Sequence, residues 1–149
     1  MTYKISFILV ILLGLGACGN EKNNAGLPVP DAPPRQLDAA QLALGKQIFA
    51  DNCAQCHGDQ AQGAPNWRKR DADGFYPAPP LNGSGHGWHH STEVLSNVIN
   101  NGSVPGQGKM PGWEGKLSAQ EVSAVIAWFQ STWPQPVYNA WFEMQQRGR

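Results

Sequence analysis

The chain has 149 residues, enough for one domain of ordinary size, and its 11 Lys and Arg residues balance its 11 Asp and Glu residues. This zero net charge argues against a nucleic-acid-binding protein, which would normally be basic. With 41% hydrophobic and only 15% charged residues the chain is not wholly disordered, and its three Cys residues are too few for a disulfide scaffold. The 17 Gly and 12 Pro residues predict extensive loops.

The N-terminal segment is predicted to be a targeting signal rather than part of the folded domain. Residues 7–15 form an apolar run that follows Lys4 and is short for a membrane span. The run leads into Leu-Gly-Ala and then Cys18, which resembles the lipobox of bacterial lipoproteins, where cleavage precedes the Cys and its sulfur is lipidated. We therefore expect residues 1–17 to be a lipoprotein signal peptide and Cys18 to be lipidated. The alternative is an ordinary signal peptide followed by a chance Cys.

The segment 18–37, which starts at the lipidated Cys, is predicted to be a linker. It has several Asn and Gly residues followed by four Pro residues, and it shows no helical or strand periodicity. A Pro-rich chain extends about 3.1 Å per residue, so this linker would hold the following domain away from a membrane surface. We place that domain at residues 38–149, with its packed part ending near residue 145.

The first predicted helix begins after Asp38. Asp38 is a favourable N-cap residue, and Gln41 at the third helical position completes a capping-box pattern. Leu42, Gly45 and Phe49 follow at spacings of three and four, so they would share one face of this helix.

A second helix is predicted over residues 91–100. Ser91 can cap it, Glu93 suits the positive charge at its N-terminal end, and Gly102 ends it. A third helix has the clearest signals, because Ser118 begins a second capping box and apolar side chains then recur at helical spacing as far as Trp133.

Pro134 is predicted to stop the third helix, and a fourth, short helix is expected around residues 138–146. No stretch alternates with period two, so the fold class is predicted to be all-α. Two long segments rich in Gly and Pro, 58–90 and 102–117, separate the helices and would leave a poorly filled centre. A large apolar cofactor would fill that centre.

The chemistry of the chain is concentrated in a C-x-x-C-H sequence formed by Cys53, Cys56 and His57, which is the haem c attachment signature. One helical turn would present the two thiols to the two haem vinyl groups, for thioether formation, and would place the His under the iron. A thioredoxin-like redox pair would need a βαβ context, which is absent. Half of a zinc site would need further ligands at matching spacing, and the nearest His residues lie roughly 30 residues away in a Gly-rich loop.

Six-coordinate iron needs a second axial ligand, for which the candidates are Met110, Met144, His86, His89 and His90. We favour Met110, because its loop of Gly and Pro residues precedes the last clear helix and can carry the thioether to the distal face of the haem. Met110 also belongs to no helical stripe, which disfavours a role in core packing. Met144 is expected to be a packed or exposed residue of the C-terminal tail.

Residues 42–133 resemble a class I c-type cytochrome, close to the single-haem domains found alone or as the cytochrome subunit of bacterial respiratory oxidases. The matching features are the order of Cys-x-x-Cys-His-Gly, Met-Pro and the capped last helix. In this family a Gly and an aromatic residue, here Gly45 and Phe49, pack the N-terminal helix against an aromatic residue of the C-terminal helix. The resemblance therefore implies Trp128 as that partner, with Phe129 as the second choice.

The resemblance also implies the all-α cytochrome c fold, with three to five helices and long loops around one covalent haem c. A Pro carbonyl is expected to orient the axial His, and within residues 77–83 we favour Pro80. The departures from the family pattern are an insert at 64–76, the His cluster and the tail after Trp133. They leave the choice of partner open.

Three further features have alternative interpretations. The basic run that begins at Trp67 and ends at Arg70 either docks an acidic partner, meets a haem propionate or is a solvated loop. Trp88 and Trp113 either hydrogen-bond propionates or pack. His89 and His90 either cap the second helix or lie near the haem edge, and no third ligand for a copper site is indicated.

The resemblance implies an electron-transfer protein rather than an enzyme, in which the iron changes oxidation state while both axial ligands stay bound. Its expected partners are redox proteins, such as a terminal oxidase or a dehydrogenase, and a membrane contacted through the lipid anchor, with no nucleic acid. We expect it in the bacterial cell envelope, facing the periplasm or the cell exterior, and the absence of an acidic residue after Cys18 favours the outer membrane. The alternative is a haem sensor or redox enzyme subunit whose distal ligand is absent or displaceable.

Overall fold

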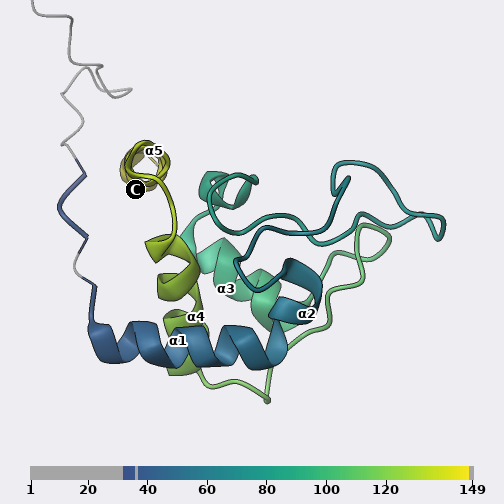
Figure 1. The fold of residues 1–149 in the computed structure, drawn as a ribbon, viewed down its shortest axis with the longest axis horizontal. Coiled ribbons are helices and arrows are strands. Elements are labelled where there is room, and N and C mark those ends of the chain that lie inside the picture. Colours follow the sequence, from purple (N-terminus) through teal and green to yellow (C-terminus); the bar gives the residue numbers. More distant parts are fainter. Residues whose placement is uncertain (1–31, 36, 148–149) are drawn as a thin grey trace, which may run out of the picture.

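Helices and long loops make up the part of the chain that the computed structural model describes, residues 32–35 and 37–147 (Figure 1). The elements in order are α1 (Ala39–Asn52), α2 (Ala54–His57), the 3-10 turn η1 (Gly87–His89), α3 (Thr92–Asn101), α4 (Ala119–Ser131) and α5 (Gln135–Arg147). This part of the chain contains no β-strand, only an isolated bridge between Glu114 and Leu117. The all-α prediction is confirmed.

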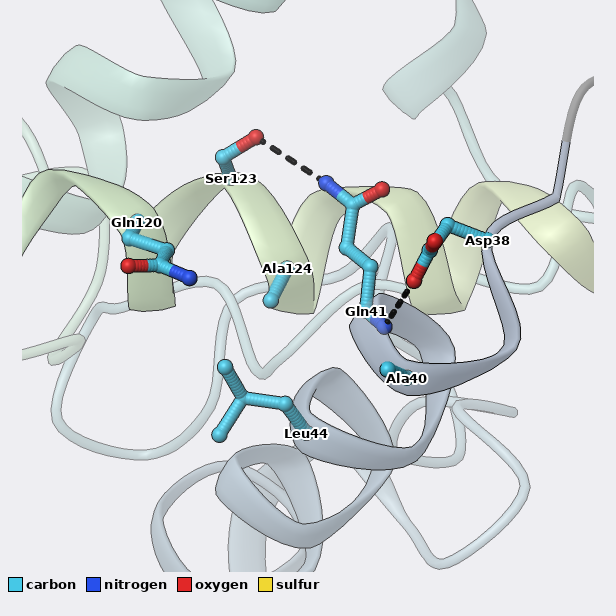
Figure 2. A pocket seen from close by; sticks show the side chains of 7 residues that line it. All are labelled: Asp38, Ala40, Gln41, Leu44, Gln120, Ser123 and Ala124. Carbon is cyan, nitrogen blue, oxygen red and sulfur yellow. Dashed lines mark hydrogen bonds between the residues drawn. The ribbon is translucent and has the colours of Figure 1, made fainter.

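The start of α1 lies where the capping residues predicted it. The Asp38 side chain accepts a hydrogen bond from the Gln41 backbone N–H at 2.6 Å. The Gln41 side chain does not complete the predicted capping box, because it donates across to Ser123 Oγ on α4 at 3.3 Å (Figure 2). The side chain that was expected to close the helix end therefore links two helices instead.

The crossing of α1 and α4 forms the centre of the fold, and Gly45 allows the close approach (Figure 1). A Cβ atom at Gly45 would lie 2.0 Å from the Ala124 carbonyl oxygen, so no side chain fits there unless a helix moves. One turn further along α1, the rings of Phe49 and Trp128 lie 4.4 Å apart between centroids. The choice of Trp128 over Phe129 is confirmed, since Phe129 lies in a neighbouring cluster with residues of α3.

The caps of α3 and α4 agree with the sequence. Ser91 Oγ accepts the backbone N–H of Val94 at 3.1 Å, and Gly102, with φ of 81°, follows the last residue of α3. At α4 the capping box is complete, and the Ser118 backbone N–H holds the pKa of the Glu121 carboxyl below its usual value. Both helix starts are thus determined by residues within one turn.

The end of α4 differs from the prediction, because the helix stops at Ser131 and Trp133 lies beyond it. Trp133 is nevertheless only 3% exposed, and its indole N–H donates to the Leu81 carbonyl at 2.7 Å. This bond ties the loop after α2 to the end of α4. After Pro134, α5 is longer than the short helix expected around residues 138–146.

Arg35, which precedes α1, binds the C-terminal end of α4. Its guanidinium donates to the carbonyls of Gln130, Ser131 and Trp133 at 2.6–3.1 Å and lies over the Tyr138 ring at 4.5 Å. The last carbonyls of a helix carry partial negative charge, so a cation is favourable there. The chain is therefore already held against the domain before the predicted boundary at Asp38.

The predictions for residues 1–17, for Cys18 and for most of the linker fall outside the described residues. Within residues 32–35 and 37–147, no helix combines the length and apolar character needed to cross a bilayer.

Candidate functional site

The C-x-x-C-H residues form the single helical turn that their spacing predicts. Cys53 is the N-cap of α2, and His57, the last residue of this helix, donates its backbone N–H to the Cys53 carbonyl at 2.9 Å. Both Cys residues and His57 line one cavity, and His57 is buried while Cys56 is exposed. The turn thus places two thiols and an imidazole along the same wall.

The imidazole of His57 is oriented by the carbonyl of Pro79, which accepts a hydrogen bond from Nδ1 at 2.9 Å. The expected residue, Pro80, is wrong by one position. Because Nδ1 donates, Nε2 is the unprotonated nitrogen and can bind a metal. Burial lowers the pKa of His57, against the opposing effect of this hydrogen bond, and so favours the neutral imidazole that ligates metal ions.

Pro80 is buried and packs closely against two glycines of the neighbouring loop segments. A Cβ atom on Gly63 would lie 2.4 Å from the Pro80 nitrogen, and one on Gly85 would lie 2.2 Å from the Pro80 carbonyl oxygen. No side chain therefore fits at position 63 or position 85, where the chain packs against Pro80. The sequence has three closely spaced prolines in this segment, and only the path of the loop decides which carbonyl faces the imidazole.

The Cys53 thiol does not have the lowered pKa of an activated redox thiol. Burial, and secondarily the neighbouring Cys56, raise the pKa of the Cys53 thiol to about 11, whereas redox-active thiols have lowered pKa values. Among the described residues no group of three or more His, Cys, Asp or Glu side chains could hold a metal ion. The geometry therefore supports neither the thioredoxin-like interpretation nor the zinc interpretation of this motif.

A cavity of about 560 Å³ lies beside α2, within the roughly 300–1,000 Å³ range of small-molecule and cofactor sites. Its lining is mostly apolar and comes from α1, α2, α3, α4 and the two long loops. Cys53, Cys56, His57 and Met110 all border it. These residues fit a flat apolar cofactor that is joined to two thiols and ligated through a metal, which is the chemistry of haem c.

Met110 is held at the cavity wall by its own backbone. Its N–H donates to Ser103 Oγ at 3.1 Å, and its carbonyl accepts the Ser103 N–H at 3.0 Å. A Cβ atom on Gly102 would lie 2.6 Å from the Met110 carbonyl oxygen, so the end of α3 and the loop can touch only because Gly102 lacks a side chain. Met144, by contrast, lies on α5 and does not line the cavity.

The three His residues of the cluster separate into two environments. His86 and His90 line the cavity and lie edge to face, with ring centroids 5.5 Å apart. Trp67 stacks on His86 at 5.4 Å, and burial lowers the pKa of His86. His89 instead stacks on Trp88 at 3.6 Å, and the cap of α3 is Ser91 rather than a His.

The two Trp residues that were candidates for binding propionates, Trp88 and Trp113, lie in different surroundings. Trp113 lines the cavity, whereas Trp88 packs against the core cluster that contains Leu95 and Phe129. Packing is therefore the observed role of Trp88, and only Trp113 lies where a group in the cavity can reach it.

Comparison with known proteins shows a match over most of the described chain. The family model described as "Cytochrome C oxidase, cbb3-type, subunit III" matches residues 40–129. The cbb3-type cytochrome c oxidase subunit CcoP of Azospirillum sp. (strain B510) is 33% identical over 94 residues, which cover 63% of this chain and 29% of that subunit. The chain thus corresponds to less than a third of the length of this relative.

Relatives with other names include a short cytochrome and a longer enzyme. Cytochrome c6 of Cladophora glomerata is 34% identical over 91 residues, covering 60% of this chain and 86% of that protein. A nitrite reductase of Stutzerimonas stutzeri is 29% identical over 113 residues, covering 72% of this chain and 19% of that enzyme. The crystal structure of cytochrome CL from Methylophaga aminisulfidivorans MPT is 21% identical, with a TM-score of 0.43 over 64% of this chain and 55% of that one.

Proposed function

Because the chain belongs to the c-type cytochromes, in the family of the cbb3-type cytochrome c oxidase subunit III, we propose that it is a membrane-anchored single-haem carrier of single electrons in a bacterial periplasmic redox chain. Its cofactor is one covalent haem c. The observation that carries the proposal is the convergence of the C-x-x-C-H turn and Met110 on one mostly apolar cavity.

In this proposal the residues of the cavity divide the work of holding the cofactor. Cys53 and Cys56 would form the thioethers, while His57 and Met110 would ligate the iron. The Pro79 carbonyl keeps the His57 ring in the orientation and tautomer that ligation needs. The haem, when bound, supplies the one-electron chemistry.

The chain would set the reduction potential through its ligands and walls. A His and Met ligand pair raises the potential relative to two His ligands. The apolar walls exclude water and so disfavour the additional positive charge of ferric iron. Both effects favour a carrier that accepts an electron readily.

We propose redox proteins as donor and acceptor, with a terminal oxidase or a dehydrogenase as the chemical class. Relatives named as oxidase subunits and as a nitrite reductase support this choice, since part of each matches this chain. The location that these partners favour is a membrane surface facing the periplasm.

The proposal is tested by a redox titration of the purified protein and by visible spectra of the ferrous form with and without carbon monoxide. We expect a reversible one-electron transition and a ferrous spectrum that carbon monoxide changes only slowly, because His57 and Met110 would both ligate the iron. Rapid binding of carbon monoxide by the wild-type protein would instead favour the haem sensor or enzyme subunit.

The membrane attachment is tested at Cys18, whose position after Leu-Gly-Ala supports lipidation. Cys18→Ala should move the processed protein from the membrane fraction to the soluble fraction, because stable anchoring needs more than one acyl chain and the variant would carry none. The measurement is fractionation combined with fatty-acid labelling, and an unchanged haem spectrum is the control. Equal membrane retention of the processed variant would refute the lipid anchor.

A further inference from the structure

The segment 64–76, predicted from the sequence to be an insert relative to the family pattern, lies against the loop that carries Met110. Arg70 Nη1 donates to the Gly106 carbonyl at 2.8 Å, and the Tyr76 backbone N–H donates to the Gln107 carbonyl at 2.9 Å. Lys109 Nζ pairs with Asp71 at 3.3 Å and also with Asp73. All these contacts reach residues 106–109, directly before Met110.

Contacts within the insert, residues 64–76, hold the side chains that meet the loop. The Arg70 guanidinium lies over the Tyr76 ring at 4.4 Å and also donates to the Gly74 carbonyl. The Asp71 carboxylate accepts the backbone N–H groups of Asp73 and Phe75 at 3.0 and 2.9 Å, which shapes the turn that presents both acidic side chains. The side chains that meet the loop are therefore held by contacts within the insert.

The loop 103–110 has little to hold it by itself. Val104 is 66% exposed, and the two glycines at 106 and 108 add conformational freedom. The hydrogen bonds between Ser103 and Met110 close the base of this loop, but its tip contacts the insert. A segment with so few buried apolar contacts is expected to open locally unless something restrains it.

The contacts differ in strength. The ion pairs of Lys109 are exposed, so each contributes little and is screened by salt. Arg70 donates charge-assisted hydrogen bonds to backbone carbonyls of both the insert and the loop, and such bonds are stronger than neutral ones. Arg70 is therefore the residue whose loss should free the loop most.

We propose that residues 64–76 are a clamp that holds the loop 103–110 closed, with Arg70 as the positioning residue that keeps Met110 at its place in the cavity. The inference rests on the proposed role of Met110 as the distal iron ligand. Asp71 and Tyr76 also border the cavity, so the clamp forms part of its wall as well. Opening of the clamp would let Met110 leave, and a small exogenous ligand could then reach the distal position.

The test compares Arg70→Met with Lys69→Met in the haem-loaded protein. Lys69 is a matched control because it lies in the same insert, is exposed, and makes no side-chain hydrogen bond or ion pair with any residue that the structure describes. Association of carbon monoxide with the ferrous protein is followed by stopped flow, and amide hydrogen exchange is measured at Gln107 and Met110.

In Arg70→Met we expect carbon monoxide to associate about five- to tenfold faster, because loss of a charge-assisted hydrogen bond shifts the balance between closed and open loop by about that factor. The Gln107 and Met110 amides should exchange faster by a similar factor, while Lys69→Met behaves as wild type. Asp73→Asn provides an independent variant, for which we expect an increase of about twofold that high salt abolishes.

The outcomes separate the clamp from the ligand assignment. If the wild type is six-coordinate and Arg70→Met matches Lys69→Met in both measurements, the clamp is refuted and the role of Met110 stands. If the wild-type iron is already open, the ligand assignment fails, and faster exchange in Arg70→Met alone would still support a clamp on this loop. Should Arg70→Met fail to fold, a salt-independent rate in Asp73→Asn equal to that of wild type would overturn the proposal.

Discussion

Replacement of Cys53 and Cys56 by Ser is expected to abolish covalent haem and to leave the chain largely unfolded. The cavity of about 560 Å³ is walled by α1, α2, α3 and α4, so without its cofactor the helices would lose a shared apolar surface. A domain is stable by only about 5–15 kcal/mol, which the loss of such a surface can exceed. Acid–acetone extraction measures the attached haem, and circular dichroism measures the helix content.

The control for this experiment is Cys18→Ser, which removes a thiol elsewhere and should retain haem. Each single variant, Cys53→Ser and Cys56→Ser, should keep at most one thioether. If the double variant retained haem after extraction, the assignment of the C-x-x-C-H turn as the attachment site would be wrong.

Met110→Ala is expected to open the distal coordination position. The ferrous variant should bind carbon monoxide quickly, and its reduction potential should fall because a thioether favours ferrous iron. We expect a fall on the order of 0.1 V, a fraction of the roughly 0.8 V over which axial ligands set haem potentials. Met110→His should keep the iron six-coordinate and also lower the potential. Visible spectra and redox titration measure both effects.

Two controls make the assignment of Met110 specific. Met144→Ala should change neither property, because Met144 lies on α5 and outside the cavity lining. Joint replacement of His86, His89 and His90 should leave the iron six-coordinate, although His86 and His90 do border the cavity. If the triple His variant, and not Met110→Ala, became five-coordinate, the distal ligand would be a His.

The clamp also bears on how Met110→Ala should be interpreted. The backbone bonds between Ser103 and Met110, and those from the insert to residues 106–109, do not involve the Met110 thioether. The loop should therefore stay closed in Met110→Ala, and the change in ligand binding would report the loss of the sulfur alone. In Arg70→Met the sulfur is present and only its restraint is lost.

The sequence by itself determined the features whose causes lie within a few residues. Asp38, Ser91 and Ser118 cap helices as expected, because a cap needs only a side-chain oxygen and an amide two or three positions later. The C-x-x-C-H turn could also be predicted, because its hydrogen bond joins residues only four positions apart. The periodicity of apolar residues predicted the all-α class, whereas the pairing of Phe49 with Trp128 was predicted only through the family resemblance.

Only the tertiary structure decided the contacts between loops. It selected Pro79 over its neighbour Pro80, turned His86 and His90 toward the cavity but stacked His89 on Trp88, and joined Arg70 to Gly106. Each of these contacts joins or orients residues in segments without periodicity, where glycines with positive φ such as Gly63 and Gly106 set the path of the chain. Adjacent residues then face different surroundings for reasons that lie tens of residues away, and no local pattern encodes them.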